Sequence, residues 1–472
     1  MKPARYMDRV PWAARGTRLQ NGRAAAGPVL IIVLWVAFGL VSLALYFAHS
    51  MSFELRAADN RVAVVQAQHA IEGAARYVSN ILSTVEALGA LPDPLTYHAE
   101  AVQVGEARFW IIGRAPGEWQ ADYTRPMFAL VDEASKLNLN TATAEMLQML
   151  PGMTPDLAAA VVTWRSAATQ TGGGADDVAY ARLSPPYRCK HAPFETIEEL
   201  RMVYGMTPEL LFGEDINLNG VLDPNENDGD LRPPADNRDS RLDPGLLEYV
   251  TVYTREPNTG RTNVNNPEQL AQLLAARLGT QRASEIAARL GRAPGPGQAQ
   301  PPRQGGQQAG AVRISSVLEF FVLSGLTREE FELIANDITA SDAPYIEGLV
   351  NVNTAPEQVL ACIPGIGPQN APALVAYRQN HPDKLSSVAW VVEVLGQQSA
   401  LLAAPYITTR SYQFTADIAA VGRLGRGYQR VRFVFDTSEG QPKVIFRRDL
   451  THLGWALGKD VLGNLRLATR RP

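Results

Sequence analysis

Apolar and polar residues follow three different patterns along the chain. Residues 28–48 (PVLIIVLWVAFGLVSLALYFA) contain no charged side chain, so a helix there would be apolar on every side. Residues 52–90 contain no proline, and their apolar residues recur near helical spacing, so the helix is predicted to continue. Alternation of apolar and polar residues predicts strands at 107–113, 122–132, 411–420, 427–437 and 442–449. Strands on both sides of a helical region, 136–410, predict an α+β fold: one small antiparallel sheet interrupted by a large inserted all-α domain.

The uncharged segment has the length of a membrane-spanning helix. Its 21 residues span about 30 Å at 1.5 Å per residue, the thickness of the hydrocarbon core of a bilayer. A secretory signal peptide would have a shorter apolar stretch followed by small residues, whereas Tyr46, Phe47 and His49 stand at the end of this one. Residues 1–27 carry six basic side chains and one acidic side chain, which places the N-terminus in the cytoplasm. We therefore expect a retained single-pass anchor and an exported bulk.

The helix after the anchor suggests a filament subunit. Its apolar positions at helical spacing are Leu55, Val62, Val65, Ile71, Val78, Ile81 and Leu82. A membrane helix that continues as a long amphipathic helix, followed by short strands, resembles a type IV pilin or pseudopilin. The basic leader of a pilin is cleaved after a glycine, and the corresponding site here lies between Gly27 and Pro28. Pilins usually have Phe or Met in place of Pro28 and Glu in place of Ile32, so a plain single-pass anchor is the alternative.

A repeat of 30 residues occurs in the middle of the chain. Residues 136–165 and 349–378 align without a gap at an offset of 213. The positions that they share are Asn138/Asn351, Asn140/Asn353, Thr141/Thr354, Ala142/Ala355, Leu147/Leu360, Pro151/Pro364, Gly152/Gly365, Pro155/Pro368, Ala158/Ala371, Val162/Val375 and Arg165/Arg378. A weaker copy begins at residue 261 (RTNVNNPEQLAQLL). So many matches establish an internal repeat, with units at about 136–213, 261–338 and 349–406.

Each unit is predicted to contain two helices joined by a Pro-Gly turn, a layout that resembles a helix-hairpin-helix unit. Asn140-Thr141, or Asn353-Thr354 in the last copy, would cap the first helix with a side-chain oxygen. The two asparagines of each N-x-N pattern lie on one side of an extended segment. We expect them to serve cap and turn chemistry rather than to bind a ligand.

Helix-hairpin-helix units can bind DNA, so a membrane-anchored DNA receptor is the alternative function. Backbone N–H groups of a G-x-G hairpin would then contact a phosphate, beside Lys or Arg. Only the last unit has a complete Gly365-Ile366-Gly367, and Thr154 replaces the second glycine in the first unit. The net charge is -4 for the whole chain and about -9 outside residues 1–27, which gives no support for nucleic-acid binding. A structural use of the hairpins is favoured.

The anchor and the repeated N-x-N-T-A-x-x-x-x-L pattern together resemble the type II secretion minor pseudopilin K family (general secretion pathway protein K). Absence of the fifth-position glutamate is a feature of that family, so Ile32 agrees with it. The resemblance implies a pilin fold with an inserted α-domain, and a non-catalytic role at the tip of the secretion pseudopilus. It implies other minor pseudopilins, the secretion apparatus and the inner membrane as partners, with the bulk of the chain in the periplasm. The domains expected are a basic leader (1–27), a transmembrane and amphipathic helix (28–90), the first part of the sheet (91–135), the inserted domain (136–410) and C-terminal strands (411–472).

Residues 215–226 (DINLNGVLDPNE) have the ligand spacing of an EF-hand calcium loop. The expected ligands are the side chains of Asp215, Asn217, Asn219, Asp223 and Glu226 and the carbonyl of Val221. Gly220 stands at the sixth position, where such a loop turns sharply. Calcium is the expected cofactor, and an acidic solvated linker is the alternative interpretation.

No catalytic constellation is recognisable, so we do not expect an enzyme. The six histidines are scattered, and no P-loop, G-x-S-x-G or H-E-x-x-H pattern occurs. Two cysteines, Cys189 and Cys362, exclude a disulfide framework and a cysteine-rich zinc domain, and the sequence leaves open whether they pair. Residues 291–311 are of low complexity and are predicted to be disordered.

Overall fold

The computed structural model describes residues 26–114, 124–167, 174–229, 231, 233–291 and 313–470. The chain forms two compact units, Met1–Asn60 and Arg61–Pro472. The predicted basic leader lies outside the described residues except at its end, and so does almost all of the low-complexity segment. Gly27 and Pro28 are described only as backbone.

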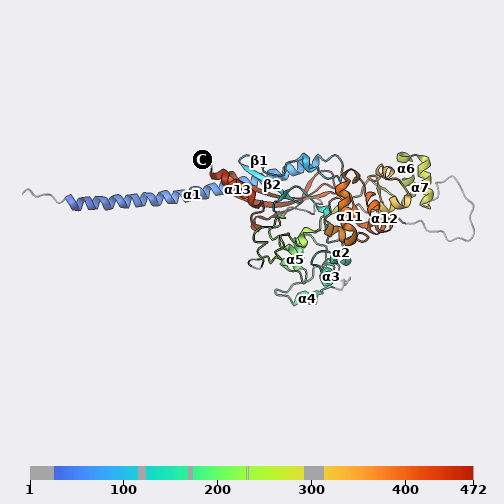
Figure 1. Ribbon diagram of the computed structural model, residues 1–472, viewed down its shortest axis with the longest axis horizontal. Helices are drawn as coiled ribbons and strands as arrows, with labels where there is room; N and C mark the ends of the chain where they lie inside the picture. The colour runs from blue at the N-terminus through green and yellow to red at the C-terminus, as the bar shows by residue number, and fades with distance from the viewer. Residues whose placement is uncertain are drawn as a thin grey trace, which may run out of the picture. The chain divides into compact units, whose positions relative to one another are not determined.

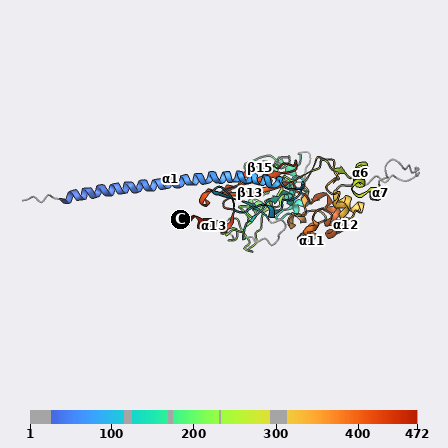
Figure 2. The same ribbon diagram turned by 90° about the horizontal axis from the view of Figure 1, so that it is seen from above.

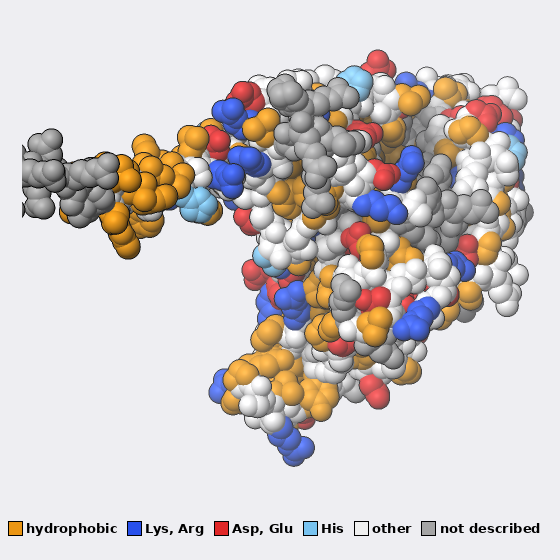
Figure 3. All heavy atoms as spheres, turned by 60° about the vertical axis from the view of Figure 1, so that its left-hand side comes forward, with side chains coloured by type: hydrophobic (Ala, Val, Ile, Leu, Met, Phe, Trp, Pro, Cys, Tyr) orange, Lys and Arg blue, Asp and Glu red, His pale blue; other side chains and the backbone are white. Residues whose placement is uncertain are grey.

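One helix, α1 (Ala26–Ser83), contains both the predicted membrane segment and its continuation. From Val29 onward it is long and apolar enough to cross a membrane. Large apolar side chains up to Phe53 are exposed, and they form an almost continuous orange surface in Figure 3. A helix that is apolar on every side needs an apolar environment, which fits a single-pass membrane anchor. The helix ends at Ser83 rather than at residue 90 as predicted. At its end, the hydroxyl groups of Ser83 and Thr84 donate to carbonyls of the last turn.

An antiparallel sheet of seven strands joins the two ends of the second unit. The strands are β1 (Val102–Val104), β2 (Ala107–Gly113), β3 (Met127–Phe128), β4 (Val131–Asp132), β13 (Gln413–Val421), β14 (Gln429–Asp436) and β15 (Lys443–Asp449). The main order is β1-β2-β13-β14-β15, with β3 beside β2 and β4 beside β13. Early strands in blue therefore lie against late strands in red (Figure 1). The sequence predicted β2, β13, β14 and β15, but it did not predict β1, and the single strand predicted at 122–132 is divided into β3 and β4.

One face of the sheet is covered by α1. Phe414, Ile418 and Phe433 are buried in the same apolar cluster as Ile71 and Val78 of the helix. This cluster is the core that the amphipathic pattern predicts, because residues on alternate positions of a strand share a face. Part of the opposite face is covered by a C-terminal helix, α13 (Gly458–Arg470), which the sequence analysis did not predict.

On that opposite face, the first half of β13 is polar. Gln413, Thr415 and Asp417 alternate with the apolar residues of β13, so their side chains point away from α1. Gln413 donates to the carbonyl of Arg255 (3.0 Å), and Thr415 donates to the carboxylate of Glu133 (2.7 Å). Both partners follow β4 in the chain. Arg255 belongs to the inserted region and Glu133 lies just before its start, so side-chain hydrogen bonds from β13 attach the inserted region and its start to the sheet.

The first strand of each of the three repeat units pairs in parallel with a short strand at or beyond the end expected for that unit, and this pair closes the unit. The pairs are β5 (Leu137–Asn138) with β6 (Val250–Thr251), β8 (Thr262–Asn263) with β9 (Ile338–Thr339), and β11 (Val350–Asn351) with β12 (Ile407–Thr408). A further pair, β7 (Arg255–Pro257) with β10 (Tyr345–Glu347), is antiparallel. The prediction of an all-α insertion is therefore wrong in this respect. Strands of two or three residues are too short to show an alternating pattern.

Short helices fill each unit between its paired strands. The first unit contains α2 (Ala144–Gln148), α3 (Pro155–Arg165), α4 (Asp177–Ala181) and α5 (Pro208–Phe212). The second contains α6 (Pro267–Leu278), α7 (Thr280–Arg289), α8 (Val317–Ser324) and α9 (Arg328–Glu332), and the third contains α10 (Glu357–Ala361), α11 (Gly367–Asn380) and α12 (Trp390–Ala403). Figures 1 and 2 both place the third unit between the sheet and helices α6 and α7 of the second.

The first asparagine of each N-x-N pattern holds its unit closed. Its Nδ2 donates to the third residue after the closing threonine: Asn138 to Thr254 (2.8 Å), Asn263 to Asp342 (2.5 Å) and Asn351 to Ser411 (2.8 Å). Its Oδ1 accepts from the backbone N–H two residues further on. Both ends of the amide are used inside the protein, so these asparagines have a structural role.

The second asparagine fixes a loop rather than capping a helix. Asn140 donates to the carbonyl of Phe194 (3.0 Å), and the N–H of Phe194 donates to Asn140 Oδ1 (2.7 Å). The predicted cap at Asn140-Thr141 is wrong, because α2 begins after Thr143, whose hydroxyl accepts from the N–H of Met146. The corresponding position in the third unit is Pro356, which makes no side-chain cap.

Candidate metal-binding loop

The predicted calcium loop, residues 215–226, lies directly after α5 and is largely buried. Asp215, Asn219 and Glu226 are each at most 1% exposed, and Asn217 is 8% exposed. Val221 is also buried. The loop is therefore part of the folded body rather than a solvated linker.

The loop wraps around its first carboxylate. Gly220 has a φ of 70°, the left-handed conformation that a sharp turn at the sixth position requires. Its N–H donates to Asp215 Oδ2 (2.8 Å), and the N–H of Asn219 donates to Asp215 Oδ1 (2.9 Å). A Cβ atom at Gly220 would lie 3.0 Å from the guanidinium of Arg114, so this glycine also allows that side chain to approach.

The remaining candidate ligands meet inside the loop. Asn217 and Asn219 both donate through Nδ2 to Asp223 Oδ2, at 2.8 and 3.2 Å. Glu226 reaches back across the loop: its Oε1 accepts from the N–H of Ile216 (3.1 Å) and its Oε2 from the N–H of Asp223 (2.9 Å). The structure therefore brings the predicted side chains together in one loop.

The charges in this loop are not balanced within it. Burial raises the pKa of the Glu226 carboxyl to about 8, and the nearby carboxylates of Asp215 and Asp223 contribute to the rise. The Oδ1 atom of Asn217 is buried and has no hydrogen-bond partner among the described residues. A bound cation would supply the missing partner and offset the buried negative charge.

The donor set fits calcium, which accepts about six to eight oxygen ligands of mixed type. Among the described residues, no three His, Cys, Asp or Glu side chains are gathered as they would be around a metal ion. A cation here would therefore use the amide oxygens of Asn217 and Asn219 and the carbonyl of Val221, in addition to carboxylates.

Arg430 is a site residue that the sequence analysis missed. It lies on β14 and is fully buried. Its Nε and Nη2 donate to the two carboxylate oxygens of Asp417, both at 2.8 Å. Its Nη1 and Nη2 also donate to the carbonyls of Asn217 (2.5 Å) and Leu218 (2.7 Å) in the loop. One arginine therefore links the loop to the sheet.

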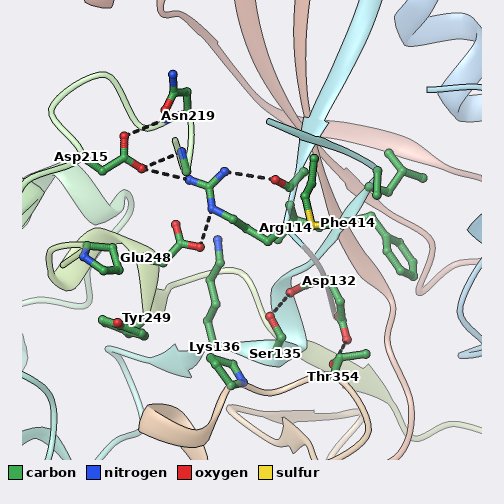
Figure 4. A pocket seen from close by; sticks show the side chains of 18 of the residues that line it. Arg114, Asp132, Ser135, Lys136, Asp215, Asn219, Glu248, Tyr249, Thr354 and Phe414 are labelled. Atoms are coloured by element: carbon green, nitrogen blue, oxygen red, sulfur yellow. Dashed lines mark hydrogen bonds and ion pairs between the residues drawn. The ribbon is translucent and has the colours of Figure 1, made fainter. Parts of the chain in front are cut away.

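Arg114, which directly follows β2, is the second residue that the sequence analysis missed. Its Nε donates to Glu248 Oε1 at 2.7 Å, and its Nη2 lies 3.4 Å from Asp215 Oδ2. Figure 4 shows the guanidinium between the two carboxylates. The side chain lines a cavity of about 300 Å³ that also reaches Asp132 and Phe414.

The other residues singled out in the sequence have no such surroundings. Cys189 and Cys362 are both buried and free, so they do not form a disulfide in this structure. Burial raises the pKa of the Cys362 thiol to about 12, as expected for a core residue. The candidate cleavage site between Gly27 and Pro28 lies in the first turn of α1.

One comparison with known proteins, a family model, agrees with the family resemblance. Residues 129–212 match the family model described as "Type II secretion system (T2SS), protein K". No curated protein matches the chain. A chain in the crystal structure of the GspK–GspI–GspJ complex from the enterotoxigenic Escherichia coli type 2 secretion system aligns over 86% of this chain and 99% of its own length. The identity is 9% and the TM-score is 0.36.

In class, the protein is an α+β chain with a long apolar N-terminal helix and an antiparallel sheet. The matched stretch includes β4, the first N-x-N strand and helices α2 to α5. Over these residues the family model confirms the resemblance to the type II secretion minor pseudopilin K family. The family model, rather than the superposition, supports this assignment.

Proposed function

We propose that this protein is a minor pseudopilin that occupies the tip of the type II secretion pseudopilus, starts its assembly and catalyses no reaction. The match of residues 129–212 to protein K of this system carries the proposal. Deletion of the gene should stop secretion, and expression of the full chain in the deletion strain should restore it. Secretion that continues without the gene would contradict the role.

The size of the insertion supports a place at the end of a filament. Asp132 and Ser411 lie 279 positions apart in the sequence, yet they are hydrogen-bonded. The chain between them forms three repeat units outside the sheet. Such bulk would collide with its neighbours if it were repeated along a close-packed helical filament, whereas an end accommodates it once.

The start of the anchor supports the same place. In pilin-like filaments the fifth-position glutamate is thought to neutralise the N-terminal amine of the next subunit above. This chain has Ile32 at that position, so it offers no such charge. A subunit with no neighbour above it does not need one. We further propose that α1 anchors the chain in the inner membrane, with residues 1–27 on the cytoplasmic side and the second compact unit in the periplasm.

The proposed partners are other minor pseudopilins, bound through α1. Ile71 and Val78 of this helix pack against the sheet and are at most 1% exposed, so they cannot contact a partner. Val62 and Val65 are each 49% exposed, so an apolar strip of α1 is open to a partner helix.

We also propose that the loop 215–226 binds calcium and that this calcium is structural. Support comes from the side chains of Asn217, Asn219 and Asp223, which meet inside the loop, and from the buried and unpartnered Asn217 Oδ1. The crowding of Glu226 with Asp215 and Asp223, which raises its pKa, adds to this support. Asp215, Asn217, Asn219, Asp223, Glu226 and the carbonyl of Val221 would hold the ion. The ion would supply positive charge and cross-link the ends of the loop, without taking part in a reaction.

DNA binding, the alternative function, finds less support. The N–H groups of Ile366 and Gly367 donate to the carbonyl of Ile363 (3.1 and 3.2 Å), so the hairpin uses them internally. Gly365 is packed so closely against Ser399 that a Cβ atom would lie 2.3 Å from its carbonyl oxygen. A mobility-shift assay of the full chain with duplex DNA distinguishes the two functions, because salt-sensitive binding would favour a receptor.

A further inference from the structure

We propose that the loop 215–226 is a cation-dependent latch between the inserted region and the sheet. Arg430 holds the backbone of the loop, and Arg114 occupies Asp215 until a divalent cation takes its place. The inference rests on the calcium site proposed above. It adds a mechanical role for that site, and it adds Arg430 and Arg114, which are not part of the calcium-ligand pattern.

The first half of the latch is the buried fork of Arg430. The guanidinium donates hydrogen bonds to two parts of the protein. In the sheet it donates to the carboxylate of Asp417, and in the loop it donates to the carbonyls of Asn217 and Leu218. Leu218 has a φ of 55°, a left-handed conformation that is uncommon for leucine and that the surrounding contacts must maintain.

Arg430 and a bound cation would not compete for the same atoms. The two carbonyls that Arg430 binds stand at loop positions 3 and 4, whereas an EF-hand loop offers its position-7 carbonyl, here that of Val221. The carboxylate oxygens of Asp215 accept from the N–H groups of Asn219 and Gly220, so they point into the loop. A cation and Arg430 can therefore hold the loop at the same time, one from inside and one from the sheet.

Arg430 also couples the rigidity of the loop 215–226 to that of the sheet. Its side chain is 0% exposed, so a loop that moved away would leave buried N–H donors without partners. Burial opposes ionisation of Asp417, but Arg430 and Arg432 together lower its pKa to about 2, so this carboxylate stays charged and holds Arg430 in place. A loop made rigid by a cation should therefore also make β13 and β14 more rigid.

The second half of the latch is Arg114. Its contact with Asp215 is long, 3.4 Å, whereas its contact with Glu248 is short, 2.7 Å (Figure 4). Without a divalent cation, this guanidinium is the positive group nearest to Asp215 among the interactions that the structure shows. A cation bound to Asp215 would repel the guanidinium, which keeps its stronger partner, Glu248. Arg114 and the cation therefore compete, and removal of Arg114 should strengthen cation binding.

Hydrogen exchange and calorimetry on the full chain in detergent test both halves. In the wild type, calcium compared with a chelator should slow amide exchange in the loop and also in β13 and β14. Arg430→Lys keeps a positive charge for Asp417, but one ammonium with three N–H groups cannot replace the four bonds that Arg430 makes to Asp417 and to the two loop carbonyls. Calcium should then slow exchange in the loop alone. Arg432→Lys is the matched control, because Arg432 donates to the same carboxylate (2.8 Å) from the same strand; it should retain the effect on the sheet.

Calorimetric titration with calcium should give a Kd several-fold lower for Arg114→Gln than for the wild type. This side chain is partly exposed, so the substitution tests the latch even if Arg430→Lys fails to fold. Absence of calcium binding by the wild type would overturn the calcium site together with the latch. Three results would overturn the latch alone. In the wild type, calcium could slow exchange in the loop but not in the sheet, or it could slow exchange in the sheet equally in Arg430→Lys and the wild type. The third result is a Kd for calcium in Arg114→Gln that equals or exceeds that of the wild type.

Discussion

The carboxylate of Asp132 accepts a hydrogen bond from the hydroxyl of Ser411 at 2.6 Å, although the two residues are 279 positions apart. The same oxygen accepts from Thr354 (2.6 Å) and Asn351 (3.3 Å) of the third repeat unit. The inserted region thus leaves the sheet and returns to it at one buried carboxylate. This arrangement lets β4 and β13 pair as neighbours despite the intervening chain.

Stability should depend on pH through Asp132. Burial raises its pKa from the ordinary value of 3.8 to about 6, and hydrogen bonds from Ser411 and Thr354 only partly oppose this. The pKa of Asp132 is higher in the folded protein than in the unfolded chain, so ionisation of this carboxyl lowers the free energy of unfolding. This loss of stability is complete above pH 6 and vanishes below about pH 4. The loss is about 3 kcal/mol at pH 7. Asp132→Asn should therefore gain stability relative to the wild type on going from pH 4.5 to pH 7, as measured by urea unfolding. A stability difference that is the same at both pH values would contradict this origin.

The first asparagine of a repeat should matter more than other asparagines. Asn351 is fully buried, and its amide bonds Ser411 and Asp132. Asn351→Ala leaves these groups with fewer partners and should cost about 1–3 kcal/mol of unfolding free energy. Asn380→Ala, on the exposed side of α11, is the control and should change little. Equal losses from the two substitutions would show that the N-x-N pattern does not hold the unit closed.

The exposed strip of α1 should bind the partner subunits. Val65→Arg should greatly reduce co-purification of the full chain with the other minor pseudopilins while its melting temperature stays near that of the wild type. Leu402→Arg, at an apolar site on the insertion that is somewhat more exposed than Val65, should leave the complex intact. Ile71→Arg should instead unfold the compact unit Arg61–Pro472, because it places a charge against the sheet. Full complex formation by the Val65→Arg chain would exclude this strip as the contact.

Calcium should raise the melting temperature of the full chain. Sites of this type outside the cytoplasm bind at about 10⁻⁴–10⁻³ M, and ligand at a hundred times Kd stabilises the folded state by about 2.7 kcal/mol. Asp215→Ala and Glu226→Ala should each abolish the rise. Asp239→Ala, which removes an exposed carboxylate outside the loop, should retain it. An undiminished rise in both loop variants would place the ion elsewhere.

The sequence could predict the features that short stretches of chain encode. The alternation in β2, β13, β14 and β15 extends over seven to nine residues, which is enough to identify each strand. The spacing of oxygen donors in residues 215–226 is equally local. The closing strands β6, β9 and β12 each have two residues and pair with strands far away in sequence, so no local pattern could show them.

The residues that connect the loop to the sheet were beyond prediction for the same reason. Arg430 bonds the carbonyl of Asn217 across 213 positions, and Arg114 reaches Asp215 across 101. The alternation in β14 does place Arg430 on the face opposite Val431 and Phe433. Only the folded chain shows that the loop 215–226 lies against that face.

Labelling of isolated pseudopili with gold-conjugated antibody against residues 136–410 tests the central claim most directly. A minor pseudopilin whose insertion is too large to repeat along the filament should be labelled at one end only. Gold along the whole length of the filaments would contradict the account.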